Sequence, residues 1–114
     1  MQDQVNIFND QITRLRTEIG RVLVGQTEVV NGVLTCLVAD GHVLLEGVPG
    51  LGKTLLVRTL ADCLSMTYRR IQFTPDLMPA DIIGTEILNE DESGNRRLEF
   101  QHGPVFTQVL LADE

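Results

Sequence analysis

The sequence predicts an α/β fold in which helices flank a parallel β-sheet. Three observations support this class. Short apolar runs alternate with segments of helical periodicity, a glycine-rich loop joins the first run to a helix, and an Asp-Glu pair follows the last run. Parallel strands joined by right-handed crossovers place their ligands beyond the carboxyl ends of the strands. We therefore expect the loop and the acidic pair at the same edge of the sheet.

Two helices are predicted before the first strand. Residues 4–19 form an amphipathic pattern, with apolar residues at spacings of three and four: Val5, Phe8, Ile12, Leu15 and Ile19. The short apolar stretch 22–24, between two glycines, is expected to link the helices. The second helix is predicted from Thr27, as its N-cap, to Asp40, with Gly41 as the stop.

The middle of the chain predicts strand, loop, helix and strand in turn. Residues 42–46 are a short apolar run next to glycine, typical of a buried parallel strand. After the loop, residues 53–65 have helical spacing, and residues 68–73 are predicted as a second strand. Pro75 and Pro79 are expected to bound a loop.

A β-hairpin is predicted next, with arms at 85–88 and 97–101. The second arm alternates polar and apolar residues, and residues 91–95 supply turn chemistry. A helical turn is expected at 105–108, followed by a last buried strand at 109–112 that leads into Asp113 and Glu114.

The glycine-rich loop has the pattern Gly-x-x-x-x-Gly-Lys-Thr, complete at Gly47-Val48-Pro49-Gly50-Leu51-Gly52-Lys53-Thr54. Glycines let backbone N–H groups approach phosphate oxygens, and the helix that follows adds its free amides, Leu55 included, and its dipole. Lys53 is expected to reach the β- and γ-phosphates, and the Thr54 hydroxyl to ligate Mg²⁺. Pro49 stiffens the loop. The pattern predicts binding of a nucleoside triphosphate, ATP with Mg²⁺.

An acidic pair at the end of a strand is weak evidence by itself, because strand ends often carry solvated acids. The phosphate-binding loop in the same chain makes a functional role for the pair the expected one. In a phosphate-binding protein, Asp113 is expected to hold Mg²⁺, through water, opposite Thr54. Glu114 is then expected to orient and deprotonate the attacking water, with Lys53 as the other catalytic residue.

Composition is that of an ordinary globular domain: 114 residues, 43% hydrophobic and 22% charged. The net charge of −7 argues against non-specific nucleic-acid binding. No apolar run approaches the length of a membrane span, and the polar N-terminus does not resemble a signal peptide. Cys36 and Cys63 lie in apolar patterns and are expected to be reduced core thiols, and we expect a cytoplasmic location.

The chain resembles the MoxR-type AAA+ ATPases over nearly its whole length. The loop matches the Walker A pattern, and the run Leu110-Leu111-Ala112-Asp113-Glu114 matches Walker B. Three further stretches carry the resemblance: Val24-Gly25-Gln26, Arg70-Ile71-Gln72-Phe73-Thr74-Pro75-Asp76-Leu77-Met78-Pro79 and Gly103-Pro104-Val105-Phe106. The second of these is far more family-specific than the loop.

The resemblance implies ATP as the nucleotide, a hexameric ring, and ATP hydrolysis that drives chaperone-like remodelling, often with partners that contain von Willebrand factor A domains. It places Val24 and Gly25 near the adenine, a simple linker being the alternative. It divides the chain into N-terminal helices at 1–41 and a P-loop core at 42–114, with the 85–101 hairpin as a pore-facing insertion. A plain surface hairpin is the alternative.

The family pattern continues beyond Glu114, with a fourth strand carrying a polar sensor, an arginine finger, a fifth strand and a helical lid. Its strand order, 5-1-4-3-2, places the fourth strand between 42–46 and 109–113. We therefore expect residues 1–114 to be an incomplete AAA+ domain with exposed strand edges and little or no ATP turnover.

Other functions remain open from the sequence. Asp81-Ile82-Ile83-Gly84 fits the metal motif of GTPases, although no strand precedes it and no Asn-Lys-x-Asp signature is present. A small kinase could use the same loop. A truncated, non-catalytic nucleotide-binding or assembly module is the alternative from a different class.

Overall fold

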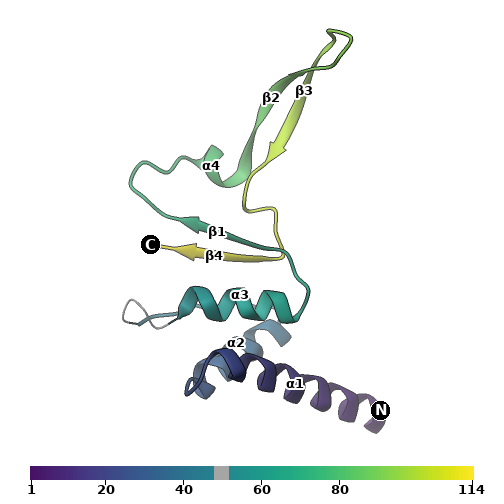
Figure 1. The fold of residues 1–114 in the computed structure, drawn as a ribbon, viewed down its shortest axis with the longest axis vertical. Coiled ribbons are helices and arrows are strands. Elements are labelled where there is room, and N and C mark those ends of the chain that lie inside the picture. Colours follow the sequence, from purple (N-terminus) through teal and green to yellow (C-terminus); the bar gives the residue numbers. More distant parts are fainter. Residues whose placement is uncertain (48–51) are drawn as a thin grey trace. The chain divides into compact units, whose positions relative to one another are not determined.

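The computed structural model describes residues 1–47 and 52–114 (Figure 1). The chain forms two compact units, Met1–Ser65 and Met66–Glu114.

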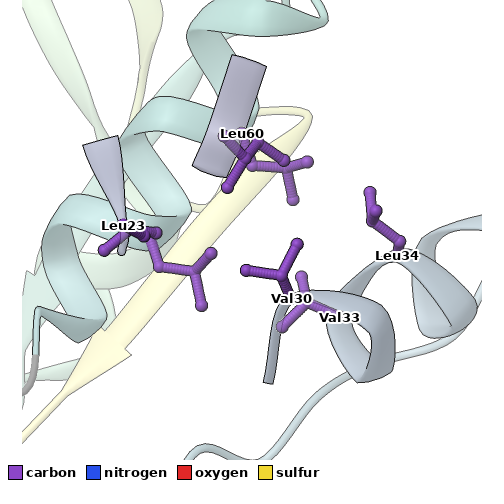
Figure 2. Packing of buried hydrophobic residues seen from close by; sticks show 7 residues of the cluster. Leu23, Val30, Val33, Leu34 and Leu60 are labelled. Atoms are coloured by element: carbon purple, nitrogen blue, oxygen red, sulfur yellow. The ribbon is translucent and has the colours of Figure 1, made fainter. Parts of the chain in front are cut away.

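The first unit consists of three helices, α1 (Gln2–Val22), α2 (Thr27–Val38) and α3 (Lys53–Cys63). Their shared core is a cluster of seven buried side chains, drawn as sticks in Figure 2: Ile19, Leu23, Val30, Val33, Leu34, Leu56 and Leu60. Burying each such side chain contributes about 1.5–3 kcal/mol. The predicted apolar face of α1 packs only near its C-terminal end, since Val5 and Phe8 are exposed.

Both ends of α2 differ from the prediction, since the helix runs from Thr27 to Val38 and its C-cap is Ala39. The N-cap is Gln26, so Thr27 is the first helical residue. At the other end, Asp40 and not Gly41 takes the left-handed conformation, with φ of 55°. The Gly41 N–H donates to Cys36 O at 2.8 Å and the Asp40 N–H to Leu37 O at 3.2 Å. These two bonds form a Schellman motif, which ends the helix before the glycine.

The predicted strand at 42–46 is wrong, because this segment forms no ladder with any described residue. A strand exists through hydrogen bonds to a neighbouring strand, and an apolar run alone does not supply one. The segment still contributes to the core, since Leu45 packs against the helical cluster. Leu44, by contrast, is 85% exposed.

A parallel pair of strands, β1 (Tyr68–Gln72) and β4 (Val109–Asp113), lies in the second unit. The two strands run side by side in Figure 1, with Tyr68 opposite Val109 and Gln72 opposite Asp113. The predicted strand order made these two segments neighbours, and the parallel sheet is confirmed. Thr67 fixes the start of the pair, because its hydroxyl accepts the Gln108 N–H at 3.0 Å.

The predicted hairpin is confirmed as β2 (Gly84–Glu90) paired antiparallel with β3 (Arg96–His102). Asp91 organises the turn, as the sequence predicted. Its Oδ1 accepts the N–H groups of Ser93 at 3.0 Å and Asn95 at 2.8 Å. Gly94 supplies the positive φ of 81° that the turn needs.

A short helix that was not predicted, α4 (Pro79–Ile83), precedes the hairpin and begins at the proline where the predicted loop ends. Pro79 is its first residue, where a missing N–H costs nothing, and the Asp81 carboxylate accepts the Met78 N–H at 2.9 Å. The carbonyls of Ile82 and Ile83 then accept N–H groups from the segment after β3. The predicted helical turn at 105–108 is wrong, since that segment is a turn followed by bends.

The two cysteines are free thiols, but only one is partly buried. Cys36 is half-buried in α2, whereas Cys63 is exposed at the end of α3, which corrects the expectation of two core thiols. Among the described residues, no helix combines the length and hydropathy that a membrane span requires.

Candidate functional site: the loop before α3 and the end of β4

The helix that follows the glycine-rich loop begins at a glycine, without a side-chain hydrogen bond from the N-cap to the first turn. Gly52 is the N-cap of α3 and adopts φ of 77°, a conformation that a side chain would strain. As a glycine it offers no side-chain oxygen to the first turn. The helical bonds begin with Leu56, whose N–H donates to Gly52 O at 2.8 Å. The amides of Lys53, Thr54 and Leu55 precede that ladder and form the kind of N-terminus that binds anions.

Lys53 turns back toward the beginning of the loop. Its ammonium group donates a hydrogen bond to Gly47 O at 3.1 Å, and the side chain is half-buried. The cation is therefore positioned between the end of 42–46 and the first turn of α3. Thr54, which follows it, is also half-buried in that first turn. The predicted phosphate-binding residues Val48, Pro49, Gly50 and Leu51 lie outside the described residues.

A cavity of about 420 Å³ adjoins Lys53 within the first unit. Its walls come from α2, the segment 42–46 and the first turns of α3, and are largely apolar. Gln26 contributes to its lining, but the predicted adenine-contacting residues Val24 and Gly25 do not. Val24 is 84% exposed, and Gly25 is exposed as well.

Asp113 and Glu114 belong to the second unit, at the carboxyl end of β4. The Phe73 N–H donates to Asp113 O at 2.7 Å, which extends the ladder with β1 to the last residue of the strand. The Glu114 N–H donates to Asp113 Oδ1 at 3.0 Å. The Asp113 side chain is 33% exposed, so it is accessible from solvent at the end of the strand.

Arg70, for which the sequence predicted no role, contacts the Asp113 carboxylate. Its Nε donates to Asp113 Oδ2 at 3.1 Å, and its Nη2 forms an ion pair with the same oxygen. The register explains the contact, since Gln72 pairs with Asp113 and residues two apart in a strand share a face. An Arg two residues before the end of the neighbouring strand was the signal available in the sequence.

The residues predicted to hold Mg²⁺ have suitable chemistry, although they come from different units. The Thr54 hydroxyl and the Asp113 carboxylate are oxygen ligands of the kind that this hard cation prefers. Within 1–47 and 52–114, no group of three or more His, Cys, Asp and Glu side chains forms a metal site. Mg²⁺ usually takes one or two protein oxygen ligands together with substrate phosphates, so a hydroxyl and a carboxylate are protein ligands of the expected kind.

The structure argues against the GTPase alternative. Asp81, the acid of that motif, lies in α4, and its carboxylate caps the helix by accepting the Met78 N–H. It does not follow a strand, as the GTPase motif requires.

Comparison with known proteins decides the family. Residues 42–114 match the model of the "ATPase family associated with various cellular activities (AAA)". The chain belongs to this AAA family. Chaperone MoxR1 of Mycobacterium tuberculosis is 50% identical over 97 residues, covering 85% of this chain and 25% of that protein. Protein MoxR of Methylorubrum extorquens is 40% identical over 102 residues, covering 90% of this chain and 29% of that protein.

A solved structure gives the same result for this AAA chain. The crystal structure of a protein from Cytophaga hutchinsonii, provisionally named an ATPase, superposes with a TM-score of 0.81 at 42% identity. The match covers 99% of this chain and 33% of that one. The predicted MoxR-type AAA+ resemblance and P-loop fold are thus confirmed. The AAA chain spans a quarter to a third of the length of these relatives.

Proposed function

We propose that the protein binds ATP with Mg²⁺ at Gly47–Thr54. The observation that carries this proposal is the start of α3, where a left-handed glycine is the N-cap without a side-chain cap and Lys53 donates a hydrogen bond back to Gly47. On binding, the Lys53 ammonium exchanges its carbonyl partner for phosphate oxygens, a stronger charge-assisted interaction. The amides of Thr54 and Leu55 add their dipoles. Thr54 and Asp113 are the residues that would hold Mg²⁺, which would neutralise charge on the phosphates.

The intact protein, in this proposal, hydrolyses the ATP. Glu114 follows a strand end that is fixed by both a backbone bond and a side-chain bond to Asp113. A carboxylate in such a position can accept a proton from water and orient it for in-line attack. Lys53 stabilises charge on the phosphate oxygens as the bond to the leaving group breaks.

We further propose that the intact protein forms a hexameric ring and that ATP hydrolysis by the ring drives chaperone-like remodelling of partner proteins. We propose the cytoplasm, where ATP is supplied, as its location. The name of the 50% identical relative, a chaperone, supports this assignment. Partners with von Willebrand factor A domains and adenine contacts from Val24 and Gly25 belong to the same proposal. The exposed β2–β3 hairpin, with Leu88 and Leu98 59% and 67% exposed, provides a surface suited to a pore.

Nucleotide binding is tested by calorimetric titration of the chain with MgATP. Lys53→Ala is expected to weaken binding by at least tenfold, because it removes the cation that contacts phosphate. Arg58→Ala is the matched control, since it removes an exposed cation from the same helix and should leave binding unchanged. Equal affinity of Lys53→Ala and the native chain for MgATP would show that the loop is not the nucleotide-binding site. A GTP titration separates ATP from guanine selectivity.

Turnover is tested on the protein at its native length. Glu114→Gln is expected to keep MgATP binding and to lose at least a hundredfold in kcat, because the amide cannot take a proton from water. Unchanged turnover would exclude Glu114 from this role. Binding without any turnover by the native protein would favour the alternative, a non-catalytic nucleotide-binding or assembly module.

A further inference from the structure

The carboxylate of Asp113 is held from both sides by the chain's own donors. Oδ2 receives Nε of Arg70 at 3.1 Å together with Nη2 of the same guanidinium. Oδ1 receives the Glu114 N–H at 3.0 Å. Because the two oxygens are bonded to donors from different elements, rotation of the carboxylate would break at least one of these contacts. Its orientation is therefore set by Arg70 and by the backbone of Glu114 together.

The ion pair is specific to one arginine of β1. Arg69 and Arg70 are adjacent, but successive residues of a strand point to opposite faces. Gln72 lies opposite Asp113 in the register, and Arg70 shares the face of Gln72. Arg69 lies opposite Leu110 and faces the other side. Arg69 is therefore a matched control for Arg70, because it is the adjacent arginine and lies on the opposite face of the strand.

A forked contact of this kind orients better than an ammonium group would. Guanidinium is planar and always charged, and its Nε and Nη2 donors converge on Oδ2, which holds that oxygen near the guanidinium plane. The pair is partly exposed, with side chains 44% and 33% accessible, so its worth to stability is modest. Its main effect is then geometric, on where the Asp113 oxygens and the Glu114 backbone lie.

We propose that Arg70 is a positioning residue for the metal-dependent chemistry at the end of β4. It holds Asp113 in the orientation in which the carboxylate receives Mg²⁺ or its bound water, and through Asp113 it fixes the backbone of Glu114. This inference rests on the proposed function, since it concerns the same ATP site. Partners that orient a metal-binding carboxylate typically change metal affinity or activity by about 10- to 100-fold when removed.

The test measures turnover against Mg²⁺ concentration in the protein at its native length. Arg70→Gln is expected to raise the Mg²⁺ concentration for half-maximal turnover by roughly tenfold or more. ATP binding without metal should stay unchanged, because the loop is untouched. Arg69→Gln is the control and should behave like the native protein. A Mg²⁺ dependence that is the same in Arg70→Gln and Arg69→Gln would overturn the role of Arg70.

Two further measurements keep the result clear. Arg70→Lys keeps the positive charge but loses the two-donor guanidinium contact, so it should raise the Mg²⁺ requirement by less than Arg70→Gln. The Lys variant also provides the test if Arg70→Gln does not fold. In the 114-residue chain, the NMR signal of the Arg70 Nε–H should shift when Asp113 is changed to Asn; no shift would contradict the ion pair. Absence of turnover in the native protein would overturn the proposed function itself, whereas native turnover that Arg70→Gln does not alter overturns only this inference.

Discussion

Gly84 and Gly103 cross so closely at the base of the hairpin that neither position has room for a side chain. A Cβ atom on Gly84 would lie 2.6 Å from the Gly103 nitrogen, and one on Gly103 would lie 2.6 Å from the Gly84 nitrogen. The Gly103 N–H also donates to Ile83 O at 2.9 Å. This crossing attaches the hairpin to α4 through backbone contacts, so its geometry depends on two residues that carry no chemistry.

Alanine at this crossing should therefore destabilise the second unit. Gly103→Ala is expected to cost about 3 kcal/mol, because the obstructing atoms are backbone and cannot rotate away. Gly84→Ala adds the strain of φ at 109°. Urea unfolding followed by hairpin NMR signals measures the effect. Gly20→Ala is the control: it lies in α1 with open space around it, so it should be neutral or stabilise by about 1 kcal/mol. Similar stability of the Gly103→Ala and Gly20→Ala variants would contradict the crossing.

The core of the first unit offers a matched pair within α1. Ile19 is fully buried, whereas Ile7 is 58% exposed on the same helix. Ile19→Ala should lower the free energy of unfolding by about 2–5 kcal/mol, since it removes packed methyl groups and leaves a cavity. Ile7→Ala should change it by less than about 0.5 kcal/mol. Circular dichroism of helix content against urea concentration measures both. Comparable losses in the two variants would mean that α1 does not pack as described.

The Thr74–Leu77 turn lowers the pKa of Asp76. The Thr74 hydroxyl donates to the carboxylate at 2.7 Å, and the backbone N–H of Asp76 stabilises the same charge. A depressed folded-state pKa means that this bond contributes stability above the ordinary Asp pKa and loses it as pH falls through the folded value. Thr74→Val should raise the pKa of Asp76 toward its ordinary value in an NMR titration. Thr74→Ser, which keeps a hydroxyl, should leave it low; a rise in both variants would assign the shift to another cause.

Cys63 is exposed yet should react slowly with thiol reagents. Partial desolvation raises the pKa of its thiol, and the nearby charges of Glu18 and Asp62 raise it further. Because the thiolate is the reactive form, less of it is present at neutral pH than in a free cysteine peptide. In a Cys36→Ser background, the rate of reaction with a neutral disulfide reagent should therefore be below that of the peptide, and Glu18→Gln should increase it. A rate equal to that of the peptide would show that these surroundings do not act on the thiol.

Local signals in the sequence predicted most of the elements, because their causes are local. The spacing of Ile12, Leu15 and Ile19 predicted α1, and the turn chemistry at 91–95 predicted the hairpin, since Asp91 bonds to residues two and four positions ahead. The predicted strand at 42–46 failed for the opposite reason. An apolar run becomes a strand only when a neighbour completes its ladder, and the described residues provide none.

The candidate site shows the same division. The motif identified Lys53 and Gly52 as site residues. The structure adds their geometry, which is the hydrogen bond from Lys53 to Gly47 and the left-handed conformation of Gly52 at the N-cap. Arg70 was present in a family-specific stretch but had no assigned partner, because its contact with Asp113 joins residues 43 positions apart. Only the parallel register reveals that contact. The short helix α4 was missed because five residues carry too little periodicity, although Pro79 followed by Asp81 was a usable signal.

The ends of α2 and α3 provide a last prediction, because both place a residue other than glycine in the left-handed region. Asp40 has φ of 55° after α2, and Ser65 has φ of 53° after α3. A left-handed residue with a Cβ costs roughly 1 kcal/mol relative to glycine. Asp40→Gly and Ser65→Gly should therefore each raise the free energy of unfolding by up to about 1 kcal/mol, and their effects should add, since one residue follows α2 and the other follows α3. Gly32→Ala, inside α2 with open space around it, is the reverse control and should also stabilise. Thermal unfolding by circular dichroism measures all three; a loss of stability in Asp40→Gly would show that the Asp40 side chain contributes more to the end of α2 than its backbone conformation costs.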